Sequence, residues 1–155
     1  MINSELNMII PEIKMKAIFD KSVKKADLYQ IKSSLDAFNA FSQLFDADTF
    51  DWIEEMLLLC LNRSNHLIGY YKLSKGGVSG TVADPKVIFT TALSCGASGV
   101  IVAHNHPSGN LKASEADINF SKKVMKAGEY LEINLLDSMI LADDKYKSLK
   151  DEGLI

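Results

Sequence analysis

The sequence predicts an α/β (α+β) domain in which helices pack against a mixed β-sheet. Short apolar runs of strand length alternate with longer segments whose apolar residues repeat at helical spacing. The first two expected strands are close enough to form a hairpin, whereas the later strands are separated by helices. A chain of 155 residues is long enough for one such domain and its hydrophobic core.

The local patterns place each element. Asp84 followed by Pro85 predicts a helix start and Gly96 its end, and Pro11 favours an extended segment or edge strand over residues 1–20. The expected helices cover residues 25–45, residues 85–95 and a segment that begins at Ser114, and the expected strands cover residues 55–62, 66–74, 99–106 and 132–141.

The charge balance gives little support for nucleic-acid binding. The formal net charge is −3, and Arg63 is the only arginine. Arginine supplies the bidentate contacts to phosphate and guanine. Lysine clusters at residues 21–25 and 122–126 are more typical of solvated helix faces. A nucleic-acid partner is therefore only weakly supported.

The two cysteines, Cys60 and Cys95, each lie in an apolar stretch with no second cysteine or histidine nearby in the sequence. This pattern predicts buried free thiols. No basic segment leads into an apolar one after Met1, and the longest apolar run, residues 56–61, is too short to cross a bilayer. We therefore expect a cytoplasmic protein with reduced cysteines and no membrane partner.

One segment carries residues with metal-binding chemistry. His104 and His106 are two residues apart on an expected strand, so their side chains point to the same face. Ser114 and Asp117 fall on the first turn of the following helix. Two imidazoles and a carboxylate with an open fourth position are typical of catalytic zinc.

Each of these residues also has a purely structural interpretation. A single histidine at a strand end is more often a hydrogen-bonded residue than a ligand. Ser114 and Asp117 could form a capping box at the start of a helix. Capping and metal binding are compatible, because the cap holds the carboxylate in place.

The same residues fit the H-x-H-x7-S-x2-D pattern of the JAMM metallopeptidases. The segments HNHPSG and SEADI resemble the RadC branch of that family. The resemblance covers roughly residues 50–155. It implies an MPN-type mixed sheet flanked by helices with cytidine-deaminase-like layering. It also implies that residues 49–155 are the RadC-like domain, with residues 1–48 as an extended segment and helical leader.

The resemblance further implies a chemistry. In such enzymes zinc lowers the pKa of a water to about 7 for attack on an amide carbonyl, a glutamate transfers protons, and a serine stabilises the oxyanion. Carried over, His104, His106 and Asp117 would bind Zn²⁺ and Ser114 would be the oxyanion partner.

The glutamate is the residue that this sequence lacks at the expected place. Tyr71 aligns there, and a phenol is a poor base at neutral pH. The possible substitutes are Glu54, Glu55 and Glu115, and none is favoured. Ser138 replaces a histidine of the RadC pattern, which removes a group that could orient a ligand.

Two functions therefore stay open. The first is a zinc metallopeptidase-like hydrolase acting on a peptide or protein substrate, impaired by Tyr71. The second is a non-catalytic MPN-fold interaction module that carries the DNA-repair label of its family. The literal His-Asn-His run does not indicate an HNH nuclease, whose motif residues are dispersed. Oligomeric state is not predicted.

Overall fold

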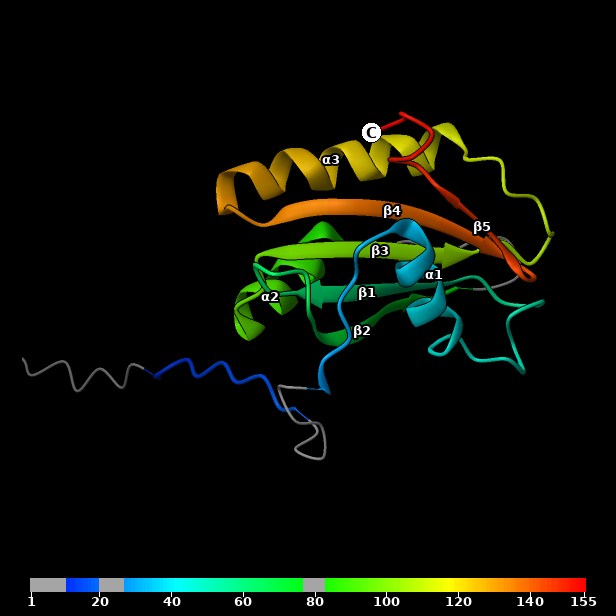
Figure 1. The fold of residues 1–155 in the computed structure, drawn as a ribbon. Helices are drawn as coiled ribbons and strands as arrows, with labels where there is room; N and C mark the ends of the chain where they lie inside the picture. Colours follow the sequence, from blue (N-terminus) through cyan, green and yellow to red (C-terminus); the bar gives the residue numbers. More distant parts are fainter. Residues whose placement is uncertain (1–10, 20–26, 77–82) are drawn as a thin grey trace, which may run out of the picture.

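A five-stranded sheet with helices on both faces forms the centre of the protein (Figure 1). The computed structural model describes residues 11–19, 27–76 and 83–155. Its elements in chain order are α1 (Ser34–Ser42), β1 (Glu55–Leu61), β2 (Leu67–Lys75), α2 (Pro85–Cys95), β3 (Gly99–Asn105), α3 (Glu115–Leu131), β4 (Asn134–Ala142) and β5 (Lys145–Ser148).

The strand order β2-β1-β3-β4-β5 makes the sheet mixed. Strands β3 and β4 are parallel, and every other neighbouring pair is antiparallel. Parallel neighbours need a crossover, which α3 supplies. The predicted fold class, a mixed sheet flanked by helices, is confirmed.

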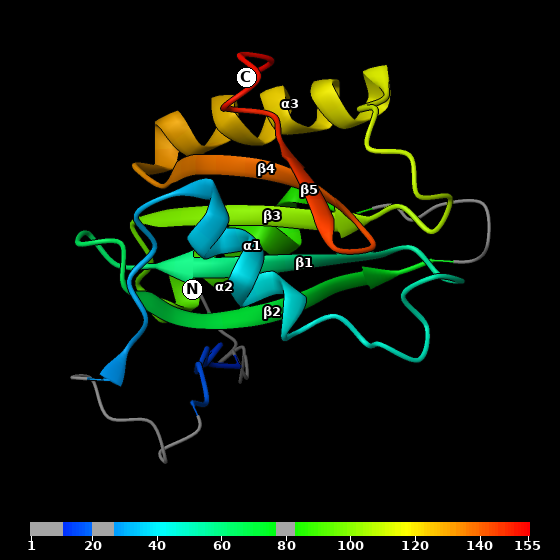
Figure 2. The same cartoon turned by 45° about the vertical axis from the view of Figure 1, so that its right-hand side comes forward.

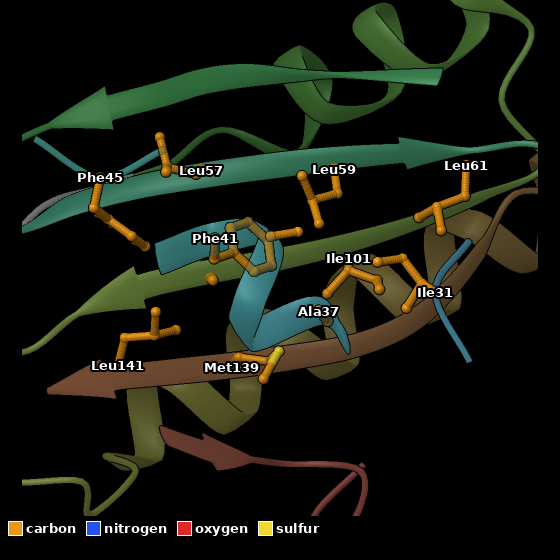
Figure 3. Close-up of a cluster of buried hydrophobic side chains, with 12 residues drawn as sticks. Ile31, Ala37, Phe41, Phe45, Leu57, Leu59, Leu61, Ile101, Met139 and Leu141 are labelled. Carbon is orange, nitrogen blue, oxygen red and sulfur yellow. The ribbon is translucent and has the colours of Figure 1, made fainter. Parts of the chain in front are cut away.

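Helix α1 covers one face of the sheet, and α2 and α3 cover the other (Figures 1 and 2). Side chains of β1 alternate between the two cores that result. Leu57 and Leu59 face α1, where they pack with Phe41 (Figure 3). Leu58 and Cys60 face α2 and α3. Although α1 precedes residue 49, its side chains pack in the same core as β1 and β3.

The helix expected over residues 25–45 is shorter in the structure. Ser33 caps α1, because its side chain accepts a hydrogen bond from the Asp36 N–H. Residues 29–31 instead bond to residues 65–67, through Ile31 N–H to the Asn65 carbonyl and Leu67 N–H to the Tyr29 carbonyl. Ile31 is buried although it lies outside the helix. Its spacing from the apolar residues of α1 therefore matched a helical period by coincidence. Residues 25 and 26 lie outside the described part.

The other expected elements agree more closely. Helix α2 begins after Asp84, and it ends at Gly96 with a φ of 68°. Strand β4 begins two residues later than expected, because Glu132 adopts a left-handed conformation after α3. Residues 11–19 form no strand. The rest of the extended segment, residues 1–10 and 20, is not described.

The sequence interpretation missed β5. This strand has only four residues and pairs with the end of β4. Its sequence, KYKS, has no apolar run that would predict a strand. Within the described residues, no helix is both long and apolar enough to cross a membrane.

If α1 is integral to the core, replacing its most buried aromatic side chain must destabilise the whole fold. Phe41 is 0% exposed and Leu35, on the same helix, is 53% exposed. We expect Phe41→Ala to lower the free energy of unfolding by about 3–5 kcal/mol, and Leu35→Ala by about 0.5 kcal/mol or less. Urea denaturation measures both changes. A loss of stability in Phe41→Ala as small as that in Leu35→Ala would show that α1 does not contribute to the core.

Candidate metal centre

Three elements meet at one end of the sheet. Strand β3 ends there, the antiparallel β1 begins there, and α3 starts above them after the loop that follows β3 (Figures 1 and 2). His104 is the next-to-last residue of β3, and His106 follows the end of the strand. Asp117 lies on the first turn of α3. The fold therefore brings together residues that are 13 positions apart.

The three side chains are close enough to share one cation. One ligand atom from each of His104, His106 and Asp117 lies within 4.8 Å of the others. The two Nε2 atoms are 2.9 Å apart, His104 Nε2 is 3.4 Å from Asp117 Oδ1, and His106 Nε2 is 4.0 Å from Asp117 Oδ2. Tetrahedral ligands about 2.0–2.1 Å from a zinc ion are about 3.4 Å from each other. The observed separations bracket that value, so the residues fit a metal ion of this kind.

A backbone contact orients His106 for metal binding. Its Nδ1 lies 2.5 Å from the carbonyl oxygen of Asn110. Because a carbonyl can only accept, Nδ1 must carry the hydrogen, which leaves the Nε2 lone pair of the neutral ring directed at His104. This type of second contact fixes the tautomer of a ligating histidine.

Burial keeps His104 neutral. The side chain is 4% exposed, and this desolvation lowers the pKa of His104 to about 4, against the opposing charge of Asp117. A neutral imidazole is the form that binds metal. The side chains of His106 and Asp117 are more exposed, at 17% and 19%, so the site is closed on the His104 side and open on the other.

A capping box holds Asp117. Its Oδ2 accepts hydrogen bonds of 2.7 Å from both the backbone N–H and the hydroxyl of Ser114, and Ser114 Oγ accepts from the Asp117 N–H. Oδ1 is left to face His104. The structural interpretation of Ser114 is therefore correct, and it aims the carboxylate at the histidines. Its expected oxyanion role would require the hydroxyl hydrogen to leave Asp117.

Asn105, between the two histidines, points to the opposite face of the strand and is 0% exposed. Its Oδ1 accepts from the Glu55 N–H at 2.7 Å, and its Nδ2 donates to the carbonyls of Phe50 and Ile53 at 2.6 and 2.9 Å. Two of these contacts are to the residues on either side of Glu54, and the third is to Phe50. Asn105 thus fixes that segment against the end of β3.

The two glutamates at the start of β1 have different surroundings. Glu55 is buried on the α1 face, where its Oε1 is 2.9 Å from Lys75 Nζ. The β1–β2 ladder extends to Glu54, whose carbonyl accepts from the Gly76 N–H at 2.8 Å. Met56 pairs with His104, so strand alternation directs Glu54 to the face that carries the histidines.

The sequence interpretation considered Glu54 but did not favour it. Glu54 lies one residue before β1, and a period of two puts it in one row with Met56 and Leu58. The pairing of Met56 with His104 brings that row close to the candidate ligands. A strand register of this kind cannot be obtained from spacing within one segment.

The structure does not bring Tyr71 to the three ligands. Tyr71 pairs with Leu58 on β2, and β1 separates β2 from β3, which amounts to about 10 Å across two strand spacings. The side chain is 47% exposed in a groove beside α2. Glu115 is exposed on the first turn of α3 and is also absent from the described ligand cluster.

Ser138 has a structural partner. It is buried on β4, and its hydroxyl lies 2.8 Å from that of Ser121, which donates to the Asp117 carbonyl. The neighbouring Asp137 is buried, and burial raises its pKa. It accepts from Ser148 Oγ and from the backbone of Lys150, which ties β4 to the C-terminal segment.

The fold and this ligand set define a JAB-type domain. Residues 31–154 match the family described as RadC-like JAB domain. The chain therefore belongs to the RadC-like JAB domain family, which confirms the resemblance drawn from the HNHPSG and SEADI segments.

Relatives in several bacteria share most of the chain. A UPF0758 protein of Flavobacterium johnsoniae is 42% identical over 127 residues, which is 82% of this chain and 54% of the relative. Those of Porphyromonas gingivalis and Aquifex aeolicus are 48% and 34% identical, covering 66% and 81% of this chain and 45% and 52% of the relatives. The chain spans about half the length of these relatives.

The effect of the Ser114–Asp117 cap on metal binding can be distinguished experimentally from its effect on helix stability. Ser33 and Asp36 form the same type of cap at α1, far from any ligand. We expect Ser114→Ala and Ser33→Ala each to lower the free energy of unfolding by about 1 kcal/mol. Only Ser114→Ala should weaken zinc binding, by about 10–100-fold, because only it loosens a ligand.

Isothermal titration with zinc and urea denaturation measure these two effects. Equal zinc affinity in the Ser114 and Ser33 variants would contradict the role assigned to the cap at Asp117.

The buried His104 predicts a pH dependence for metal-free protein. The pKa of His104 is lowered from 6.5 to about 4 in the folded protein. As the pH falls, His104 is therefore protonated in the unfolded chain before it is protonated in the folded one. The His104 contribution to stability is then fully present above pH 6.5 and is lost as the pH falls toward 4. Denaturation after chelation should show this loss. His104→Asn should remove most of it, and His66→Asn, a half-buried histidine elsewhere, should leave it unchanged.

Proposed function

We propose that this chain is a zinc-dependent hydrolase domain that cleaves a peptide or isopeptide bond. The observation that carries the proposal is the convergence of His104, His106 and Asp117 at the end of the sheet, with the Glu54 row on the same face. Three nitrogen and oxygen ligands with an open side are typical of catalytic rather than structural zinc. The chain spans only about half the length of its relatives. The same activity is therefore proposed, and not established, for proteins of the relatives' full length.

The donor set favours zinc over harder cations. Calcium and magnesium prefer oxygen ligands, whereas two imidazoles and one carboxylate suit zinc. A zinc ion held in this way supplies a Lewis acid that lowers the pKa of a water to about 7 and polarises the substrate carbonyl. His104 and His106 would bind through Nε2 and Asp117 through Oδ1.

The remaining chemistry belongs to Glu54. A carboxylate on this face can accept the proton of the attacking water and deliver it to the leaving amine. Asn105 holds the backbone on both sides of Glu54, so the carboxylate is presented from a fixed segment. Tyr71 plays no part in this scheme, because it lies on β2, two strands from the histidines.

Adjacent glutamates provide a matched test. With zinc added, we expect Glu54→Gln to lower the rate of peptide hydrolysis by about 10²–10⁴ while zinc content stays unchanged. Glu55→Gln should retain activity, because Glu55 faces the opposite core and pairs with Lys75. The measurement is turnover of a panel of peptide and isopeptide substrates, with elemental analysis of each variant.

Two results would contradict the proposal. If both glutamine variants lost activity equally, Glu54 would have no special role. If the parent protein bound zinc but hydrolysed no substrate, the alternative, a non-catalytic MPN-fold module acting through protein or DNA contacts, would account better for the site.

A further inference from the structure

Cys60 and Cys95 are in contact in the folded protein, although they are 35 positions apart. Cys60 is the next-to-last residue of β1, on the face that α2 covers, and Cys95 is the last residue of α2. Cys95 packs against the buried cluster that contains Cys60, and both cysteines line the same groove. Both are free cysteines, Cys60 buried and Cys95 half-buried. The sequence interpretation predicted buried free thiols, which is confirmed for Cys60, whereas Cys95 is free but only half-buried.

A surface groove leads to the two thiols. It has a volume of about 470 Å³ and is lined by both cysteines together with Gly69, Tyr70 and Thr91 among others. Gly69 pairs with Cys60 in the β1–β2 ladder, so the two residues share a face. A Cβ atom at Gly69 would meet no atom within 4 Å. The missing side chain therefore leaves the space above Cys60 open.

We propose that Cys60 and Cys95 are a peroxide-sensitive dithiol that forms a reversible disulfide joining β1 to α2. Cys60 is four positions along β1 from Met56, the partner of His104, which is about 13 Å of strand. This site is therefore distinct from the metal centre and does not depend on the proposed function. Where cellular thiols are kept reduced, a disulfide of this type is transient and serves redox sensing.

The environment assigns different roles to the two sulfurs. Interaction with Cys60 lowers the pKa of Cys95 to about 7, whereas interaction with Cys95 and burial raise the pKa of Cys60. Cys95 is also the more exposed of the two. A thiolate that solvent can reach is the form that peroxides oxidise, so Cys95 reacts first and Cys60 resolves.

The reaction is balanced with one peroxide. The Cys95 thiolate attacks one oxygen of hydrogen peroxide, an S–O bond forms, the O–O bond breaks, and the other oxygen leaves as hydroxide and takes up a proton as water. The Cys60 sulfur then attacks the Cys95 sulfenic acid, the S–S bond forms, and the S–O bond breaks. The proton of Cys60 leaves with the hydroxide as a second water. The two sulfurs lose two electrons and the peroxide gains them.

The test treats the full chain with hydrogen peroxide under native conditions. We expect the intact mass of the monomer to fall by about 2 Da, since two hydrogens are lost. Peptide mapping without reductant should identify a Cys60–Cys95 crosslink, and dithiothreitol should reverse it. Oxidation should also raise the urea midpoint, because the crosslink restricts the unfolded chain.

Variants test the roles. Cys60→Ala should accumulate a Cys95 sulfenic acid that dimedone traps, whereas Cys95→Ser should form neither product. Gly69→Val, which fills the opening, should slow disulfide formation several-fold without changing zinc content.

The proposal is overturned if the parent protein yields only crosslinked dimers, or only sulfinic acid at Cys95, without the intramolecular disulfide. It is also overturned if oxidation of the parent modifies neither cysteine. Because peptide mapping of the parent needs no substitution, the result does not depend on whether a variant folds.

Discussion

The candidate metal centre depends on the alternation of side chains at the end of β3. His104 and His106 point to one face and Asn105 to the other. The outer two residues supply two ligands, and the middle one binds the backbone that surrounds Glu54 and Glu55. A shift of one residue in this register would exchange the two faces. The strand would then bury both histidines toward α1 and place an amide beside Asp117.

The rest of the site is built from contacts that also stabilise the fold. Asp117 is held by the cap of α3, His106 by the Asn110 carbonyl, and His104 by burial in the sheet. A buried amide such as Asn105 would destabilise the core if its hydrogen bonds were unmade. Its three contacts to backbone satisfy it, and two of them hold the residues on either side of Glu54. Stability and the placement of ligands therefore rely on the same hydrogen bonds.

The sequence predicted the parts of the fold and site that lie within one segment. The spacing of the two histidines, and the cap formed by Ser114 and Asp117, needed only strand and helix periods. Glu54, the pairing of Cys60 with Cys95 and the exclusion of Tyr71 depend on which strands are neighbours. Short patterns do not determine that order. Tyr71 was assigned to the glutamate position by resemblance to the family, and the strand order puts it two strands away from the histidines. Strand β5 lacked any apolar signal.

The convergence of three ligands on one cation is tested most directly by the zinc content of the purified protein after zinc loading and gel filtration. Elemental analysis of the parent protein and of His106→Ala, which removes a half-buried ligand with little loss of core packing, gives a single comparison. About one zinc per chain in the parent and a large loss in His106→Ala agree with a shared site. Equal zinc in the two proteins, or none in either, would contradict it.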